Sequence, residues 1–319
     1  MHFSYVFVVL SVLTGVRVTA VINTVNNDHQ SAAICCDKPS VVCNCNINTD
    51  QSSSNVSEAI EALERKVDHL ISLVSNSSTS SPEPTNPPGI PVASCKEQYD
   101  NDPSSISQVY NINFGLQEVP VFCHMGDFGC GDGGWTLAVK INGSKRTFHY
   151  DSFLWSDTNT YNVAGGKTGF DMKETKLPSY WATPFTRVCL GMRIGQQVKF
   201  VPVDMKASSL HSLIAGGVFQ ATSLGRDKWK SLIGSYASLQ TGCNREGFNA
   251  VASQSDSAKA RIGILGNDQG DCVTCDSRIG FGTGGHTDDS NTCGDNTPNG
   301  FTSDNGGRNI KAMGYILVQ

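Results

Sequence analysis

Hard oxygen donors are concentrated in one loop near the C-terminal end of the chain. Residues 286–296 contain three aspartates and two asparagines, and they follow glycines at 282, 284 and 285 that permit tight turns. Calcium takes about six to eight oxygen ligands, which carboxylates and backbone carbonyls in such turns supply. The alternative is a solvated loop of Asx turns that a disulfide at Cys293 holds in place. The residue types alone leave both interpretations open.

Cysteine is the second residue type that could do chemistry. The 12 cysteines fit an oxidising compartment, where paired thiols become stable disulfides. Four lie near the N-terminus, and eight lie in the body of the chain, at Cys95, Cys123, Cys130, Cys189, Cys243, Cys272, Cys275 and Cys293. We expect these eight to form disulfides. The alternatives for Cys272-x-x-Cys275 are a redox pair or half of a zinc site, although zinc wants a second ligand pair that the N-terminal cysteines do not cleanly supply.

No catalytic motif accompanies these residues. The sequence contains no His-Glu-x-x-His, no Gly-x-Ser-x-Gly and no Walker loop, and its seven histidines are scattered. We therefore do not expect an enzyme. A net charge of −5 argues against nucleic-acid binding, which needs a basic face. The absence of long acidic runs argues against a simple mineral-binding template.

The elements that would position these residues are mostly short. Residues 119–123 and 135–141 are β-branched and aromatic runs around a glycine-rich turn, which predicts two strands. A closing strand is expected over 311–318, with Met313, Tyr315 and Leu317 on one face. Short helices are expected over 207–215 and 227–235. The segment 261–304 is dense in Gly, Asp and Asn and poor in apolar residues, which predicts ordered loop.

The N-terminal end predicts secretion. Residues 1–20 hold an apolar run followed by small residues, a pattern typical of a cleaved signal peptide. A signal anchor is the alternative, but the run is shorter than the roughly 20 apolar residues that span a bilayer. No other segment could span a membrane. Residues 21–54 form a polar segment with the four clustered cysteines.

A heptad pattern follows in residues 55–75. Its seam is Val56, Ile60, Leu63, Val67, Leu70 and Val74. This pattern predicts a short parallel coiled coil and a homo-oligomer formed through residues 56–74; a single amphipathic helix is the alternative. Residues 76–94 are a Ser/Thr/Pro linker, and one large domain follows over 95–319. Glycosylation sequons start at Asn55, Asn76 and Asn142, and Asn55 could instead cap the helix.

The order of the first motifs resembles a known family. Cys95, then Val121-Phe122-Cys123-His124-Met125, then Gly133-Gly134-Trp135-Thr136-Leu137 is similar to the opening of fibrinogen-related domains. The resemblance extends loosely over 95–319. The later segments Cys272–Cys275, 279–285 and Thr292-Cys293-Gly294-Asp295 are nearer the intelectin branch. The chain as a whole resembles skeletal organic matrix proteins of stony corals.

The resemblance implies an α+β, fibrinogen C-terminal-like domain, disulfide-bonded and rich in loops. Cys95 and Cys123 are the disulfide pair that we expect first. The family's calcium site would fall on Asp288 and Asp289, with Asn291 as a further ligand, and the intelectin-like pattern adds Asp295. Intelectins hold a sugar diol with a histidine next to a cysteine. Thr274 stands at that position here, and His286 is displaced, so ligand specificity does not carry over.

Together these patterns predict a secreted, extracellular matrix glycoprotein of a skeletal organic matrix. It would bind extracellular ligands through calcium-ordered loops. Two alternatives remain from the sequence. One is a calcium-dependent innate-immune lectin that recognises microbial glycans, and the other is a structural matrix glycoprotein that binds no ligand.

Overall fold

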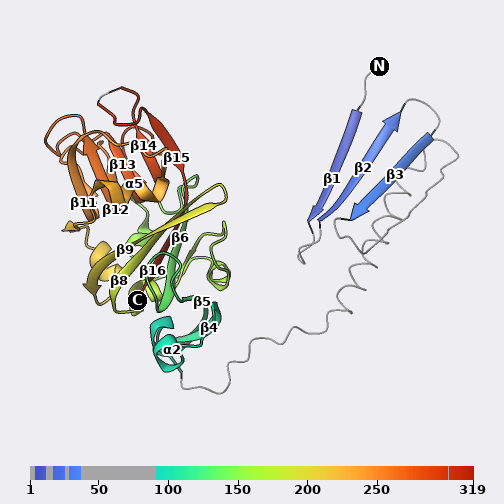
Figure 1. Ribbon diagram of the computed structural model, residues 1–319, viewed down its shortest axis with the longest axis horizontal. Coiled ribbons are helices and arrows are strands. Elements are labelled where there is room, and N and C mark those ends of the chain that lie inside the picture. The colour runs from blue at the N-terminus through green and yellow to red at the C-terminus, as the bar shows by residue number, and fades with distance from the viewer. Residues whose placement is uncertain (1–3, 12–16, 26–28, 37–90, 301) are drawn as a thin grey trace. The chain divides into compact units, whose positions relative to one another are not determined.

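The computed structural model describes residues 4–11, 17–25, 29–36, 91–300 and 302–319 (Figure 1). The chain divides into two compact units, Met1–Glu83 and Pro84–Gln319. In the first unit, β1 (Ser4–Ser11), β2 (Arg17–Val25) and β3 (His29–Cys36) pair as an antiparallel sheet. The predicted coiled coil of residues 55–75 lies outside the described residues. The signal peptide and the linker stay predictions.

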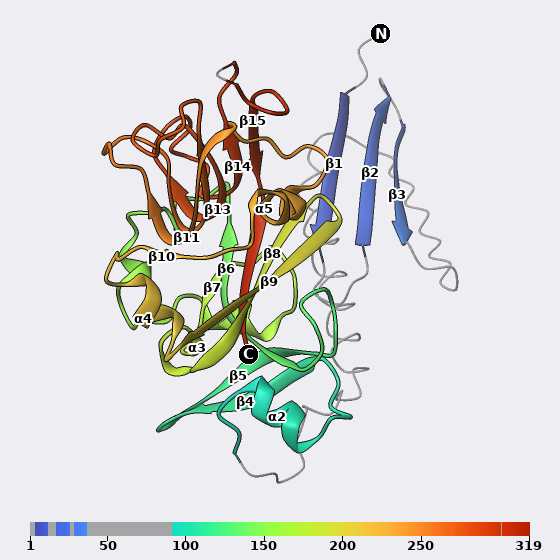
Figure 2. The same cartoon turned by 60° about the vertical axis from the view of Figure 1, so that its left-hand side comes forward.

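The C-terminal unit, residues Pro84–Gln319, is built from two antiparallel sheets. The strands of the seven-stranded sheet run, in spatial order, β4 (Gln108–Phe114), β5 (Gln117–Met125), β6 (Gly134–Asn142), β16 (Met313–Val318), β8 (Phe185–Ile194) and β9 (Gln197–Ala207), with β7 (Thr175–Lys176) on β6. Those of the six-stranded sheet run β10 (Gln220–Ala221), β11 (Gly242–Val251), β12 (Lys259–Asn267), β13 (Ser277–Gly284), β14 (Cys293–Thr297) and β15 (Arg308–Lys311). Figure 2 shows the six-stranded sheet at the end of this unit away from β4.

The expected α+β fold class is wrong, because the described secondary structure is mainly antiparallel strand. The described helices are α2 (Cys95–Asn101), α3 (Ser179–Ala182), α4 (Leu210–Ile214) and α5 (Arg226–Ile233), with 3-10 turns η1 (Phe153–Trp155) and η2 (Val163–Lys167). None of these exceeds 8 residues, so their apolar faces only cover parts of the sheets. No helical stalk is present in the part of the chain that the structure describes. Nor is any helix in that part long and apolar enough to cross a bilayer.

The core explains why β6 and β16 occupy the middle of their sheet. Every residue of β16 is buried, and β6 is buried from Gly134 to Ile141. As predicted, Met313, Tyr315 and Leu317 share one face, where they pack with Trp135 in one apolar cluster. Ile316 and Val318, on the other face of β16, belong to a second, larger cluster that also contains Trp155, Trp229 and Phe281. Both faces of the strand therefore contribute to burial.

The prediction of loop over 261–304 is wrong, because β12, β13 and β14 run through this segment. Its apolar residues alternate with glycines. Ile262, Ile264, Ile279 and Phe281 enter the larger core cluster, whereas Gly263 and Gly280 are paired across the two strands. A Cβ on Gly263 would lie 2.9 Å from the Gly280 Cα, so the close approach requires glycine. The low apolar content reflects these glycines and not a lack of strand pairing.

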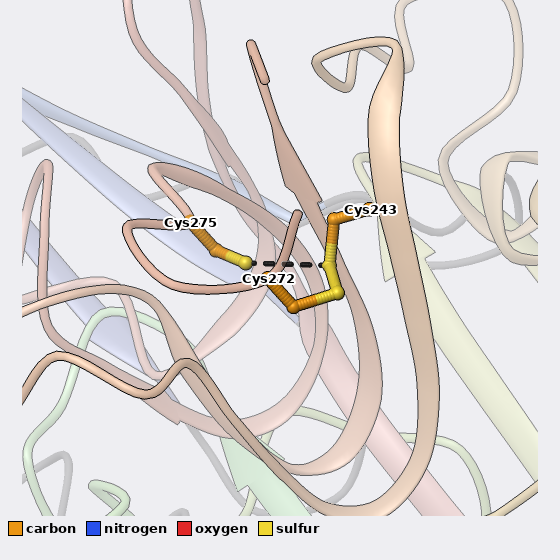
Figure 3. A group of neighbouring side chains, drawn as sticks. All are labelled: Cys243, Cys272 and Cys275. Carbon is orange, nitrogen blue, oxygen red and sulfur yellow. Dashed lines mark hydrogen bonds between the residues drawn. A yellow bond between two sulfur atoms is a disulfide. The ribbon is translucent and has the colours of Figure 1, made fainter. Parts of the chain in front are cut away.

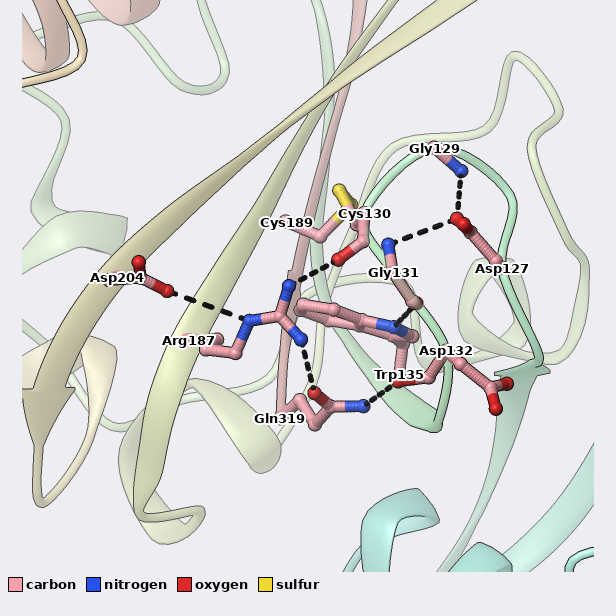
Figure 4. The surroundings of a disulfide bond; sticks show 10 residues. All are labelled: Asp127, Gly129, Cys130, Gly131, Asp132, Trp135, Arg187, Cys189, Asp204 and Gln319. Carbon is pink, nitrogen blue, oxygen red and sulfur yellow. Dashed lines mark hydrogen bonds and ion pairs between the residues drawn. A yellow bond between two sulfur atoms is a disulfide. The ribbon is translucent and has the colours of Figure 1, made fainter.

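The glycine-rich turn between β5 and β6 is fixed from two directions (Figure 4). Asp127 accepts hydrogen bonds from the N–H groups of Gly129 and Gly131, two residues with left-handed φ. On the other side, Arg187 of β8 donates to the carbonyl of Cys130 at 2.6 Å and lies over the Trp135 ring. The Cys130–Cys189 disulfide then joins the turn to β8 covalently. This turn therefore has a structural role.

Candidate functional site

The acidic loop, residues 285–292, joins β13 to β14. Residues 293–296, the end of the segment 286–296 in which the sequence analysis placed the oxygen donors, belong to β14. Arg278 of β13 is fully buried and organises the loop from its inner side. Its guanidinium donates to the carbonyls of Gly285, His286 and Asp288. Burial lowers the pKa of Arg278 to about 10, so this cation stays charged at neutral pH.

Asp288 and Asp289 point to different partners. Asp288 accepts hydrogen bonds from the Ser290 N–H at 2.8 Å and from the Asn309 amide, and Lys311 lies 3.9 Å away. Hydrogen bonds from Ser290, and then from Asn309, hold the pKa of Asp288 below its usual value. Asp288 is therefore ionised at neutral pH.

Asp289 lies against a pair of basic side chains from the segment after β6. Its carboxylate is 2.8 Å from His149 Nε2 and 3.0 Å from the Arg146 guanidinium, and it accepts the Gly285 N–H at 2.7 Å. Partial burial opposes ionisation of Asp289. The bonds from Gly285, His149 and Arg146 outweigh it and lower the pKa of Asp289 to about 2. The carboxylate thus closes the loop onto the neighbouring segment.

Asn291 and Asp295 are both fully buried. The Asn291 amide donates to the Asp295 carbonyl, to Asn309 and to the Ile310 carbonyl, whereas its Oδ1 has no partner. The Asp295 side chain faces away from the acidic loop. It accepts the Ser238 N–H at 2.7 Å and lies 3.0 Å from the Thr297 hydroxyl.

The predicted calcium ligands therefore do not converge on one ion in this conformation. Asp288 and Asp289 are already bound to donors from other elements, and Asp295 faces Ser238. Among the described residues, the only group of three or more His, Cys, Asp or Glu side chains with metal-ligand spacing is a set of cysteines, which does not suit calcium. Calcium binding stays a prediction from the sequence.

An open groove of about 610 Å³, lined mostly by residues with polar side chains and here called the polar groove, lies beside the acidic loop. Most of its exposed lining surface belongs to apolar atoms of these residues. Residues 286–288, 296–299 and 307–309 line it. Arg308 forms no ion pair with any described residue; its guanidinium donates to the Tyr236 and Gly307 carbonyls. Asn299 is exposed and its side chain makes no hydrogen bond within the described part of the chain. Asn296 accepts the N–H groups of Thr287 and Asp288 and so fixes the edge of the groove.

The sequence prediction missed Arg308, Asn299 and the organising Arg278. A signal for the two arginines was present in the sequence, since each lies within a segment dominated by Gly, Asp and Asn. Such a segment is an unusual place for a cation unless the cation has carbonyls or ligands to bind.

The structure also places the other predicted residues. The described residues contain three disulfides, Cys95–Cys123, Cys130–Cys189 and Cys243–Cys272, so the first expected pair is confirmed. Cys275 and Cys293 are buried and carry no disulfide within the described residues, which corrects the expectation that all eight cysteines are paired. Asn142 is half-buried at the end of β6. Asn55 and Asn76 lie outside the described residues.

His124 has no catalytic setting. It stacks on Phe170 with ring centroids 3.7 Å apart, and burial, reinforced by Lys140, lowers its pKa to about 3. The imidazole is therefore neutral at physiological pH and packs as an aromatic side chain. Comparison with known proteins adds no assignment, because no protein-family model and no curated protein matches the chain.

Proposed function

We propose that the chain is a secreted extracellular matrix protein whose C-terminal unit binds a glycan in the polar groove. The groove carries the proposal, because it brings an unpaired cation, a free side-chain amide and an ionised carboxylate to one concave surface. Most small-molecule pockets are lined by apolar side chains. Polar side chains predominate among the residues of this groove, although most of the exposed lining surface belongs to apolar atoms. This combination suits a sugar, which carries hydroxyl groups around an apolar ring face.

The chemistry of the lining residues matches such a ligand. The Asn299 amide can donate and accept, as neighbouring sugar hydroxyls require. Arg308 offers guanidinium N–H groups to a hydroxyl, carboxylate or sulfate oxygen. Asp288 is held at the groove edge by Asn309 and Ser290, so its carboxylate keeps a fixed position when the ligand enters. None of these contacts depends on calcium.

The extracellular part of the proposal rests on sequence and disulfides. Three disulfides are stable in an oxidising compartment. The predicted signal peptide and the resemblance to fibrinogen-related and coral skeletal matrix proteins point to secretion into a skeletal organic matrix. Oligomerisation through residues 56–74 stays a prediction, because these residues lie outside the described part of the chain.

A glycan array with the full chain tests the proposal. We expect binding to extracellular polysaccharides, in calcium and in chelator alike. Asn299→Ala and Arg308→Gln should each weaken binding at least tenfold, since each removes a direct contact. Lys228→Gln is the matched control, because Lys228 is an exposed cation on α5 outside the groove.

The array also separates the alternatives. Binding confined to microbial glycans would favour the immune lectin. No binding to any glycan would favour the alternative of a structural matrix glycoprotein that binds no ligand. Equal binding by the groove variants and the control would place the ligand elsewhere and overturn the groove assignment.

A further inference from the structure

Three cysteine sulfurs meet where β11 begins and β12 ends in the six-stranded sheet (Figure 3). Cys243 lies on β11, and Cys272 and Cys275 lie on the connection between β12 and β13. Cys243 and Cys272 form a disulfide. The Sγ of Cys275 is 3.4 Å from the Sγ of Cys243, and all three sulfurs lie within 4.8 Å of one another. A thiol thus lies in contact with a disulfide.

Backbone hydrogen bonds keep the two cysteines of the connection beside Cys243. The Cys272 carbonyl accepts the Ser253 N–H at 3.1 Å, and the Cys275 carbonyl accepts the Ala258 N–H at 2.7 Å. Cys275 is buried in a small cluster of Ala250, Ala258, Ala260 and Leu265 side chains, whereas Cys243 and Cys272 are half-buried. The closeness of the sulfurs is therefore a property of the packed strand ends.

We propose that Cys243, Cys272 and Cys275 form a thiol–disulfide exchange site with two disulfide isomers. The Cys275 thiolate attacks the Sγ of Cys243; the Cys243–Cys275 bond forms as the Cys243–Cys272 bond breaks. Cys272 leaves as a thiolate and takes up the proton that Cys275 lost. The number of thiols and disulfides is unchanged, so the step needs no oxidant or reductant. A disulfide bond is about 2.05 Å long, so Cys275 must approach Cys243 by little more than 1 Å. The side chains must also rotate, because the attacking and leaving sulfurs have to lie in line across Cys243.

Exchange moves the free thiol from a buried to an accessible position. Cys272 is half-buried and its neighbour Val273 is 47% exposed, whereas Cys275 is fully buried. The released Cys272 thiolate can attack an external disulfide, join one half of it and release the other half as a thiolate. The second isomer therefore makes Cys272 a site for mixed-disulfide formation with small or protein-borne disulfides.

The same geometry sets the pH dependence of the exchange. Only the thiolate attacks, and burial, with the neighbouring Asp276 carboxylate, raises the pKa of Cys275 to about 11. The Arg245 guanidinium opposes this effect, and Asp271 adds to it. The exchange should therefore be slow at neutral pH and accelerate roughly tenfold per pH unit as the thiolate fraction grows.

A soft metal such as zinc is the other ligand that three cysteines suggest. Metal binding needs all three as thiolates, so the Cys243–Cys272 disulfide would first have to be reduced. Exchange requires no reductant and needs only a side-chain rearrangement of sulfurs that are already in contact. The arrangement therefore favours exchange over metal binding.

The test uses the full chain and glutathione disulfide as the probe. The protein is incubated at about pH 9, quenched in acid, blocked with N-ethylmaleimide, and mapped by mass spectrometry. We expect glutathione on Cys272 together with a Cys243–Cys275 disulfide, at a rate that rises with pH. Cys275→Ala should abolish the modification of Cys272. Cys293→Ala, which removes the other buried free thiol, should leave the modification unchanged.

A second variant keeps the proposal testable if Cys275→Ala does not fold. Cys272→Ala should be secreted with a Cys243–Cys275 disulfide, because the two sulfurs are already in contact. Glutathione on Cys275 with Cys243–Cys272 intact would show a simple reactive thiol and overturn the proposal. An unmodified Cys272 in the wild-type chain, or a free Cys243 in Cys272→Ala, would do the same.

Discussion

The buried carboxyl of Asp295 should make the protein less stable as the pH rises through neutrality. Asp295 is fully buried, and this burial raises its pKa to about 7. The hydrogen bonds from Ser238 and Thr297 lower the pKa, but the effect of burial is larger. The Thr297 hydroxyl has a single proton and lies 2.7 Å from the Ser238 carbonyl, which can only accept. When that proton goes to Ser238, Thr297 can accept from a protonated Asp295. The arrangement therefore suits the neutral acid.

The size of the effect follows from the change in pKa. An aspartate in the unfolded chain has a pKa near 4, so its raised value in the folded state favours folding at low pH. This stabilisation is present in full below about pH 4 and is lost as the pH rises through about 7. One pKa unit corresponds to about 1.4 kcal/mol, so the two units between pH 5 and pH 7 amount to about 3 kcal/mol.

Urea unfolding at pH 5 and pH 8, in chelator, measures this loss. Asp295→Asn is the informative variant, because an amide can accept the Ser238 N–H and donate to Thr297 while remaining neutral. We expect its stability relative to wild type to be about 3 kcal/mol higher at pH 8 than at pH 5. Asp204→Asn is the control, since the Asp204 side chain is 93% exposed.

The reasoning is refuted if Asp295→Asn shows the same stability difference from wild type at both pH values. It is also refuted if the variant is destabilised mainly at pH 8, because that result would mean that Asp295 is ionised in the native state and bound by a cation. Repeating the measurement in millimolar calcium then distinguishes a neutral Asp295 from an ionised Asp295 bound by a cation, since calcium could bind only the ionised form.

Two further predictions concern the remaining charged groups. Asp171→Ala should lower the free energy of unfolding by about 3 kcal/mol, because it leaves the fully buried Lys140 ammonium without its ion-pair partner at 2.5 Å. Adding Lys140→Met to the same chain should recover most of this stability. If the losses from the two substitutions simply add in urea unfolding, this coupling is contradicted. The geometry of Asp288 and Asp289 leads us to expect equal Tm values in millimolar calcium and in chelator. A rise of a few degrees that Asp289→Ala removes would instead establish the calcium site predicted from the sequence.

The sequence predicted those elements whose side-chain pattern has one interpretation. β5, β6 and β16 follow runs rich in apolar and β-branched residues, whereas the Cys95–Cys123 disulfide was expected from the family resemblance. The helical segments near α4 and α5 were also recognised, although the structure makes them shorter. These elements depend on local patterns, which a single sequence displays directly.

The fold class and the segment 261–304 could not be predicted in the same way. Strand pairing there depends on backbone contact between Gly263 and Gly280, which leaves no apolar signature. The acidic loop was recognised as a site by composition. The direction of each carboxylate, however, is set by distant partners such as Arg146 and Asn309, and one sequence does not reveal such contacts.

The cysteines show the same limit. An even number of cysteines suggested complete pairing, but pairing depends on which sulfurs the sheets bring together. Cys293 is enclosed by the core beside Phe281 and Gly314. Cys275 lies beside a disulfide that already contains Cys243. Neither position follows from cysteine spacing.

Hydrogen–deuterium exchange with and without a bound matrix polysaccharide tests the central claim most directly. If the polar groove holds the glycan, the backbone amides of residues 286–288, 296, 297, 299 and 307–309 should gain protection together. Asn299→Ala should reduce that protection, and Lys228→Gln should not. Protection confined to another surface, or none at a glycan concentration that saturates binding, would contradict the proposed function.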